Sequence, residues 1–593
     1  MTKRWLPRSP DAAAPGQPGE ALVERVLRGR GLSPDDLDSF LNPTLKGMHD
    51  PGLLPDIDKA CERILRAGAS GERIVIFGDY DVDGVTASAI LVHMLRTLLP
   101  NADVTGYIPH RVDEGYGINT GAIESLAADG AKVIISVDCG ITAIEPAQAA
   151  KRLGVDLIIT DHHNPPSSID DLPDAFAVVH PRRPDSAYPW GELCGAGVAY
   201  KLAWRMATMH AGQHTVSPEC RRVLLDLLGF AALGTIADVV PLQDENRIIA
   251  RHGLVNLARS SNEGLRALIH ASKLDSDKVD AEAVGFRLAP RLNAVGRLGH
   301  AREALELLTE ATGRRATQLA EQLSALNDER RNLERSIFTQ ACEMAEDESM
   351  TGPDRRAIVL RHADWHPGVI GIVCSRLVEK YGRPALLLQH AGDVCKGSGR
   401  SIDGFNLHGA LESCADELTR FGGHDMAAGM ACASDLYTAF ADRFIECANA
   451  SLSEGDLVPS VRYDATVEHG SMSVRDVEQI ERLAPFGAGN PKVRLRVRGR
   501  ISGTPKVFGG RGDHLSFQLM GSTGAGVRVV GWNWSTHADR IPPGASIEAI
   551  VEPKLSRWNG RTTIEPVLVD LRLVSAGMVP EVVVPERAAG VSR

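Results

Sequence analysis

The sequence predicts an α/β protein: a domain built on a parallel sheet, a long helix that leads to a second α/β domain, and a small β-barrel. From about residue 70, short apolar strands alternate with amphipathic helices, which is the pattern of βαβ units. Near the other end, short strands separated by Gly turns follow one another. A chain of 593 residues also exceeds the roughly 250–300 residues of a single core, so several domains are expected.

The first domain is expected over residues 51–312, after an N-terminal accessory segment at 1–50 with a short helix. "RIVIF" (73–77) is typical of a strand, and the helical stretch "GVTASAILVHMLRTLL" follows it. Further strand-like runs are "AKVIISV", "GVDLIIT" and "AFAVV". Apolar strands of this kind, separated by helices, form a parallel sheet. Residues from about 195 onward are expected to be helical.

A stretch of 34 residues without Pro or Gly, "RRATQLAE…CEMAED", predicts one helix of about 50 Å. We expect it to connect two domains, over residues 313–351. The second α/β domain is expected over 352–460, because the strand "RAIVLRH" and two Gly-rich turns, "KGSGRS" and "FGGHDMAAG", follow. Five or six short strands over 461–575 indicate a small barrel such as an OB-fold. A loose tail is expected at 576–593.

The composition is that of a soluble globular protein, with 43% apolar residues and a net charge of −11. No run approaches the roughly 18 apolar residues of a membrane span, so no membrane association is expected. The 10 cysteines include no CxxC pair, which argues against structural zinc and fits a reducing cytoplasm. The net negative charge disfavours nucleic-acid binding unless cations cluster locally.

Three predicted strands end in acids or histidines, at the edge of a parallel sheet where ligands bind. These groups are Asp79, Asp81 and Asp83; Asp138; and Asp161, His162 and His163. If the first strand remains extended, its three carboxylates leave on one side, and they repel one another. Each acid alone is as well explained as a helix N-cap or a loop residue. Acids in consecutive units, together with a His pair, favour a metal site.

Carboxylates and imidazoles without a thiolate favour two Mn²⁺ or Mg²⁺ ions over zinc. Cys139 is expected to point away from Asp138 as a core thiol. Asp238, after the apolar run "GFAALGTIA", is either an ordinary loop residue or a further ligand from outside the sheet.

Polar residues set among glycines form a second group of candidates, since glycine lets backbone N–H groups approach an anion and Arg binds phosphate through two donors. Each segment alone is a weak signal and is more often only a turn. The candidates are Arg111 in "YIPHRVDEGYG", Arg297 in "PRLNAVGRLG", Ser398 and Arg400 in "KGSGRS", and His424 in "GGHDMAAG".

The segment "KVRLRVRGR" carries the strongest nucleic-acid signal. Its cations alternate with apolar residues and would share one face of a strand. They are Lys492, Arg494, Arg496, Arg498 and Arg500. A solvated outer face is the alternative, but such faces usually mix charges. With the nearby Trp532, Trp534 and Trp558, of which at least one is expected in the core, the segment resembles a single-strand-binding surface.

The motifs "DYDVDG", "VDCG", "DHHN" and "GTIADVVPL", in this order, resemble the signature motifs of the DHH phosphoesterase superfamily. "GGHDMAAG" resembles the glycine-rich motif of its companion domain, DHHA1. Longer segments such as "PRLNAVGRLG" and "APFGAGNP" resemble the bacterial RecJ family, from about residue 45 to 575. This resemblance implies a single-stranded-DNA-specific 5′-to-3′ exonuclease that acts in DNA repair and recombination.

The resemblance also implies residue roles. The ligands of two metal ions would be Asp79, Asp81, Asp83, Asp138, His162 and Asp238, with Asp138 between the ions. His163 would lie beside the scissile phosphate, and Asp83 and Asp138 would act with it in catalysis. The 5′ phosphate would be bound by Arg111, Arg297, Ser398 and Arg400, with His424 in a substrate-facing loop. One branch of the superfamily has a His where this chain has Phe77, which leaves Asp79 as the candidate replacement.

Two alternatives remain. A phosphodiesterase of the same superfamily would act on dinucleotides or very short RNA, and it would not need the basic barrel. A non-catalytic single-strand-binding protein with structural cations would leave His162 and His163 unexplained. The family suggests single-strand-binding protein and a helicase as partners, and we expect a monomer.

Overall fold

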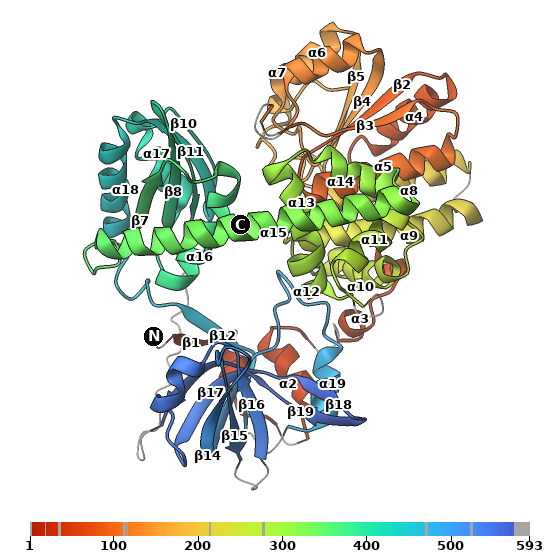
Figure 1. Cartoon of the computed structure of the whole chain (residues 1–593). Helices are drawn as coiled ribbons and strands as arrows, with labels where there is room; N and C mark the ends of the chain where they lie inside the picture. The colour runs from red at the N-terminus through yellow and green to blue at the C-terminus, as the bar shows by residue number, and fades with distance from the viewer. Residues whose placement is uncertain are drawn as a thin grey trace.

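The protein is described here by a computed structural model, in which residues 3–17, 19–33, 37–110, 114–115, 117–212, 215–275, 279–468, 472–521 and 526–574 are described. The predicted tail lies outside them. Three bodies are visible in Figure 1: a part with a parallel sheet, a smaller α/β part joined to it by one long helix, and a β-barrel below both.

The first part contains the predicted parallel sheet, in the strand order β3-β2-β4-β5-β6. The strands are β2 (Arg73–Gly78), β3 (Val104–Tyr107), β4 (Ala131–Val137), β5 (Asp156–Thr160) and β6 (Ala177–Val179). Ile74 and Ile76 pack on one side, and Val75 and Phe77 on the other. Because both faces are covered, the strands are apolar throughout. One face is covered by α4 (Ile57–Ala69), α5 (Val82–Leu98) and α8 (Gly195–His210), the other by α6 (Thr120–Ala128) and α7 (Ile144–Arg152).

A helical layer follows and leads into the long helix. It comprises α9 (Pro218–Ala237), α10 (Asp244–Ala258), α11 (Glu263–Ala271), α12 (Ala281–Ala283), α13 (Ala289–Leu298) and α14 (Arg302–Thr309). The predicted long helix is α15 (Gly313–Asp347), which has 35 residues. Leu319 and Leu323 belong to the first core, whereas Ile337 and Ala341 belong to the core of the next part. The helix therefore connects two cores, as its length predicts.

The second α/β part has the strand order β10-β11-β9-β8-β7, in which β7 and β8 are parallel and the other neighbours antiparallel. Its strands are β7 (Ile358–His362), β8 (Ala385–Ala391), β9 (Val394–Arg400), β10 (Arg420–His424) and β11 (Ala427–Ala433). Helix α16 (Pro367–Tyr381) packs with α15 on one face, while α17 (Leu407–Glu412) and α18 (Tyr437–Ser451) cover the other.

The barrel is a sheet with the order β13-β14-β15-β16-β20-β17, closed by pairing of β14 with β17. Its strands are β13 (Ala465–Glu468), β14 (Leu495–Phe508), β15 (His514–Met520), β16 (Gly526–Gly531), β17 (Ser546–Glu552) and β20 (Val567–Leu573). Beside them lie α19 (Val474–Glu481) and the hairpin β18 (Leu555–Trp558) and β19 (Arg561–Ile564). The predicted OB-type barrel is thus present.

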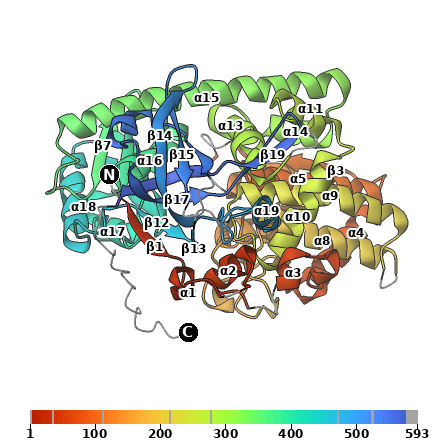
Figure 2. The ribbon, with the colours of Figure 1, turned by 90° about the horizontal axis from the view of Figure 1, so that it is seen from below.

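The N-terminal segment is part of this C-terminal body. Strand β1 (Arg4–Pro7) pairs in parallel with β12 (Ser460–Tyr463), and α2 (Leu22–Gly29) buries its apolar side in the barrel core. Figure 2 shows α1 (Pro10–Ala13) and α2 beside the barrel, with α3 (Leu37–Leu41) next to the helical layer. The Nε atoms of Arg8 and Arg30 both donate to Oδ1 of Asp464 at 2.8 Å. Local sequence patterns cannot predict such distant pairing.

The cysteines are placed as the sequence predicts for apolar core thiols. All 10 are free thiols and all except Cys447 are buried, including Cys139. Within the described ranges, no helix has the length and apolar character needed to span a bilayer.

Candidate active site

The candidate ligands gather where the central strands of the parallel sheet end. β2, β4 and β5 are neighbours, so the residues that follow them meet at one edge of the sheet. Asp79, Asp138 and Asp161 directly follow these strands and are each at most 2% exposed. Asp238 arrives from outside the sheet, at the C-terminal end of α9.

The extended acidic segment predicted after the first strand is not present. The strand ends at Gly78, and Asp81 is the N-cap of α5, where its Oδ1 accepts hydrogen bonds from the amides of Asp83 (2.9 Å) and Gly84 (3.2 Å). Asp83 lies in the first turn of the helix. The condition that the strand remains extended through the three carboxylates is therefore not met. The turn from strand to helix brings them together instead.

Asp83 is held by a second helix. Its Oδ2 accepts from the amide of Gly195 at 2.6 Å and its Oδ1 from the amide of Ala196 at 2.8 Å, at the start of α8. These amides and the positive end of the helix stabilise the carboxylate. This contact is not predicted from the sequence, although the small residues "GAG" at a helix start are a signal for close approach.

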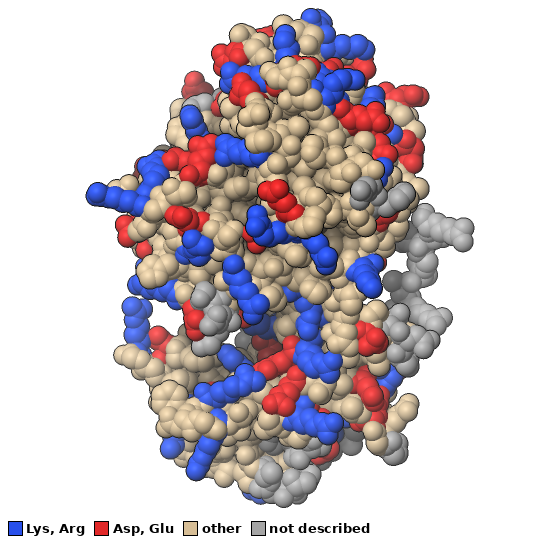
Figure 3. Space-filling model, turned by 90° about the vertical axis from the view of Figure 1, so that its right-hand side faces the viewer, with Lys and Arg blue, Asp and Glu red and all other residues tan. Residues whose placement is uncertain are grey.

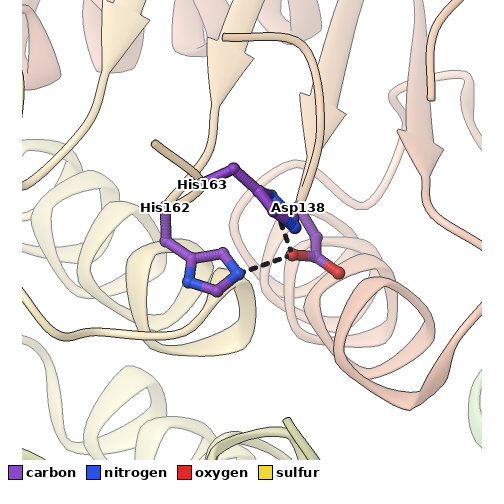
Figure 4. A group of neighbouring side chains, drawn as sticks. All are labelled: Asp138, His162 and His163. Carbon is purple, nitrogen blue, oxygen red and sulfur yellow. Dashed lines mark ion pairs between the residues drawn. The ribbon is translucent and has the colours of Figure 1, made fainter. Parts of the chain in front are cut away.

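His162 lies at the centre of the site. Its Nε2 lies 3.1 Å from Oδ1 of Asp138, 3.6 Å from Oδ2 of Asp238 and 3.8 Å from Oδ2 of Asp83. Figure 4 shows His162 and His163 pointing toward the carboxylate of Asp138. Three groups have ligand atoms within 4.8 Å of one another: Asp138, His162 and His163; Asp83, His162 and Asp238; and Asp79, Asp81 and Asp138.

The electrostatics of these groups fit bound cations. Oδ1 of Asp138 and Nε2 of His162 are buried and make no hydrogen bond among the described residues. Burial and the charge of Asp83 raise the pKa of Asp138 well above its usual range, and the same causes raise the pKa of Asp238 to about 9. Burial lowers the pKa of His162, which favours the neutral imidazole that binds metals. Oxygen and imidazole donors without a thiolate suit Mn²⁺ or Mg²⁺.

His163 is oriented by Asp161 rather than by a neighbouring ligand. Its Nδ1 lies 2.8 Å from Oδ1 of Asp161, whose Oδ2 accepts from the amide of Ile141 at 2.9 Å. Burial opposes a charged imidazole here, but the hydrogen bond and charge of Asp161 prevail and raise the pKa of His163 to about 9. The raised pKa favours the imidazolium form of His163, which suits an anionic ligand.

A supporting layer behind the two histidines also escaped the sequence analysis. Nε2 of His180 lies 2.7 Å from the backbone oxygen of His163, and Nδ1 of His180 accepts from the amide of Arg182 at 2.9 Å. This pattern fixes the tautomer, because Nδ1 is the acceptor and Nε2 must donate. Nη2 of Arg182 donates to the backbone oxygen of His162 at 2.6 Å. Both histidines of the motif are thus held through their carbonyl groups.

Two of the predicted phosphate-binding residues, Arg297 and His424, lie where the two α/β parts touch, and Ser398 and Arg400 face α16 within the second part. Nη1 of Arg297 donates to the oxygen of Gly368, in the first turn of α16, at 2.7 Å. Nδ1 of His424 lies 3.4 Å from Nδ2 of Asn164, the residue after His163. A Cβ placed on Gly371 in α16 would lie 3.3 Å from Nη2 of Arg400 and 3.5 Å from Oγ of Ser398. Arg111 lies outside the described residues.

The basic segment differs from its prediction in one respect. Its apolar and cationic residues do alternate between buried and more exposed positions. However, β17 supplies carboxylates: Arg496 and Arg498 both pair with Glu548, at 2.8 and 2.5 Å, and Arg494 pairs with Glu552 at 3.2 Å. Lys492 pairs with Glu282 at 2.6 Å. The face is therefore mixed in charge, and blue and red side chains also alternate around the hollow in the lower half of Figure 3.

Three family models match the chain, one for each of its three parts. The model of the DHH family, N-terminal domain, matches residues 73–234, the DHHA1 domain matches 354–450, and the RecJ OB domain matches 463–570. The single-stranded-DNA-specific exonuclease RecJ of Bacillus subtilis is 39% identical over 543 residues, which are 91% of this chain and 66% of that protein. RecJ of Dickeya dadantii is 36% identical, over 81% of this chain and 84% of that protein.

A solved structure supports the likeness of the whole architecture. RecJ from Thermus thermophilus in complex with Mn²⁺ matches with a TM-score of 0.79 and 32% identity, over 97% of this chain and 80% of that chain. The three matched domains, the relatives' similarity over most of their length and the gathered Asp and His side chains all agree, and the chain belongs to the RecJ family.

Proposed function

We propose that this protein is a metal-dependent exonuclease that degrades single-stranded DNA from the 5′ end, in DNA repair and recombination. The observation that carries this proposal is the cluster of buried carboxylates around Nε2 of His162, 3.1 Å from Asp138. Relatives that match 91% and 81% of this chain carry the name single-stranded-DNA-specific exonuclease. The structural match to a RecJ that holds Mn²⁺ supports the metal requirement.

The ligands of two Mn²⁺ or Mg²⁺ ions would be Asp79, Asp81, Asp83, Asp138, His162 and Asp238. Asp138 and His162 each belong to two of the three ligand groups, so the groups share residues, which supports one joint centre for both ions. Bound divalent ions lower the pKa of a water molecule and stabilise charge on the leaving oxygen.

The chain's own residues would then orient the phosphodiester. Asp161 holds Nδ1 of His163, so Nε2 is the nitrogen that would donate to a phosphate oxygen beside the ions. Arg297, Ser398 and Arg400 would bind the 5′-terminal phosphate, with Arg111 from the first part and His424 facing the substrate. In this proposal residues 51–312 carry the metal centre and residues 352–460 bind the end of the strand. The 5′-to-3′ direction is what the resemblance to the RecJ family implies.

The barrel distinguishes the rival functions. An enzyme for dinucleotides has no use for it, whereas a long strand needs a surface beyond the active site. We propose that Lys492, Arg494, Arg496 and Arg498 contribute to that surface, and that the protein acts as a monomer in the cytoplasm. Single-strand-binding protein and a helicase would supply its substrate.

The test uses 3′-labelled single and double strands with a 5′ phosphate, in Mn²⁺, Mg²⁺ or chelator. We expect the 3′-labelled single strand to shorten progressively from its 5′ end with either metal, and no shortening of the blunt duplex or in chelator. Asp138→Asn is expected to abolish this shortening while binding of the strand persists. Undiminished digestion by Asp138→Asn would contradict the catalytic assignment, and digestion of dinucleotides alone would support the first rival.

A further inference from the structure

The strand that carries Ser398 and Arg400 also presents a third polar residue on the same face. Along β9, Lys396, Ser398 and Arg400 alternate with Cys395 and Gly399, which are buried against the opposite layer. Residues two apart on a strand share a face and are separated by about 6.6 Å. The predicted phosphate-binding pair is therefore continued in one direction by a lysine.

The register of the sheet extends this pattern across three strands. β11 pairs with β9 on one side and with β10 on the other. Three rows result: Arg400, Ala427 and His424; Ser398, Gly429 and Gly422; and Lys396, Ala431 and Arg420. Small residues form the middle of each row. The first and third rows have polar or cationic residues at both ends, whereas the second has Ser398 at one end and Gly422 at the other.

The rows have a fixed order relative to the metal site. His424 contacts Asn164, which follows His163, so the first row lies beside the active site. Ser398 lies in the second row, and Lys396 and Arg420 lie in the third, farthest from the metal ligands. Any group held by the third row is thus beyond the residues expected to bind the terminal 5′ phosphate.

The second and third rows face an open cavity. A cavity of about 440 Å³ is bordered by Pro367 and Ile370 of α16, by Lys396 and Ser398, and by Arg420. Gly422 and Gly429 line it as well. A Cβ on Gly422 would meet no atom within 4 Å, and one on Gly429 would meet only the oxygen of Gly397 at 3.8 Å. Protein packing therefore does not explain these glycines, and the space above them is available to a ligand.

The charges at the outer end of this cavity are not neutralised by the protein. Lys396 and Arg420 are both exposed, and neither forms an ion pair or a side-chain hydrogen bond with another described residue. This contrasts with Lys492, Arg494, Arg496 and Arg498 of the barrel, each of which has a carboxylate partner. Two unpaired cations on β9 and β10, the strands that flank β11, are suited to an anion held over β11 between them.

We propose that Lys396 and Arg420 form a second anion subsite, which binds a phosphoryl group one step beyond the terminal 5′ phosphate. This inference rests on the proposed function, because the first phosphate is assigned to Ser398 and Arg400. The phosphoryl group has two possible sources. It belongs either to a 5′-triphosphate end or to an additional nucleotide, when the strand is bound one residue farther and a dinucleotide is released.

Binding without turnover tests the subsite independently of catalysis. Fluorescence anisotropy in chelator compares the same oligonucleotide with a 5′-hydroxyl, 5′-monophosphate or 5′-triphosphate end, and with one extra nucleotide before the phosphate. For Lys396→Ala/Arg420→Ala we expect a loss of roughly 10-fold or more in affinity for the triphosphate end or the extended strand, because two charge-assisted contacts disappear. In this variant, the strand with a 5′-monophosphate should still bind more tightly than the strand with a 5′-hydroxyl. Arg400→Ala should lose that difference instead.

Lys132→Ala, which removes an exposed cation on β4 of the first sheet, is the matched control and should leave every affinity unchanged. The products formed in Mn²⁺ identify the source: fewer dinucleotides from the double variant indicate the extra nucleotide, and an unchanged product pattern with weaker triphosphate binding indicates the triphosphate. The inference is overturned if the double variant binds all ends as the wild type does. If the wild type does not degrade the monophosphate strand, the proposed function fails, whereas the anisotropy result still decides the subsite.

Discussion

Gly195 packs directly against Asp138: a Cβ on Gly195 would lie 2.6 Å from the Cβ of Asp138. The same glycine donates its amide to Asp83, so it sets the position of two candidate ligands. Its lack of a side chain is required by the close approach of the helix start to the carboxylate, not by a special backbone angle.

Gly195→Ala should therefore impair metal binding. We expect Mn²⁺ affinity and turnover to fall about 10- to 100-fold, the range for groups that orient metal ligands. Calorimetric titration with Mn²⁺ and the initial digestion rate measure this. Gly121→Ala is the control, since it also changes a glycine in the first turn of a helix, where a Cβ would meet only Oδ1 of Asn119 at 3.5 Å. Unchanged Mn²⁺ affinity in Gly195→Ala would show that the helix start does not set the ligands.

The stability of the metal-free protein should fall as pH rises. Asp238 has a folded pKa of about 9 against an ordinary value of 3.8, so between these values the folded state holds a proton that the unfolded state has lost. Stability then decreases with pH, because the folded state binds more protons. Melting temperatures in chelator from pH 6 to 9 measure this slope. Saturating Mn²⁺ should reduce it, since the ion replaces the proton.

Asp238→Asn provides the control for that experiment. In chelator it should melt at a higher temperature than the wild type at pH 8 and show a flatter slope, because the Asn amide is neutral without the proton that Asp238 must bind on folding. Its stabilisation by Mn²⁺ should also be smaller. If the stability of this variant fell more steeply with pH than that of the wild type, the pKa of Asp238 would not be raised in the folded state.

His180 should act as a positioning residue for His163. His180→Phe removes the donor to the carbonyl of His163 but keeps an aromatic ring in a site that is 0% exposed. We expect kcat to fall about 10-fold, corresponding to about 1.4 kcal/mol for the missing hydrogen bond, with KM nearly unchanged. His180→Gln retains an amide donor and should recover part of kcat. Equal loss in both variants would indicate a packing role.

The sequence predicted the parallel sheet, the long helix and the convergence of strand ends, because these follow from local periodicity and from a general rule of parallel sheets. It also predicted Asp138 and His162 as neighbours, and Nε2 of His162 lies 3.1 Å from Oδ1 of Asp138. What it missed depends on distant partners. The amides of α8 behind Asp83 and the His180 contact join residues that no local pattern connects.

The basic segment illustrates the same limit. Along one strand, Arg496 and Arg498 appear unbalanced, but Glu548 on the neighbouring strand lies between them in space. The net charge of a sheet face depends on which strands pair. The sequence of one strand does not show which residues its neighbouring strand contributes. The role of these arginines in DNA binding remains a prediction.

Replacement of Arg494, Arg496 and Arg498 by Ala should thus affect stability as well as binding. Glu548 has a side chain that is 4% exposed, and loss of both partners would leave a buried, uncompensated charge. We expect a loss of about 3 kcal/mol in the free energy of unfolding of the barrel, measured by urea denaturation. Binding of single-stranded DNA should weaken and its salt dependence should flatten, if these residues reach phosphates.

A second variant separates the two effects. Lys506 and Arg511 are exposed on the same barrel, and no ion pair is found for them among the described residues. Lys506→Ala/Arg511→Ala should leave the unfolding free energy within about 0.5 kcal/mol of the wild type, as is usual for surface changes. For each phosphate that a removed side chain had bound, the slope of log affinity against log salt should fall by about 1. If only the triple variant changes this slope, Arg496 and Arg498 exchange their partner Glu548 for phosphate when DNA binds. If only the double variant changes it, Arg496 and Arg498 stabilise the barrel and do not bind DNA.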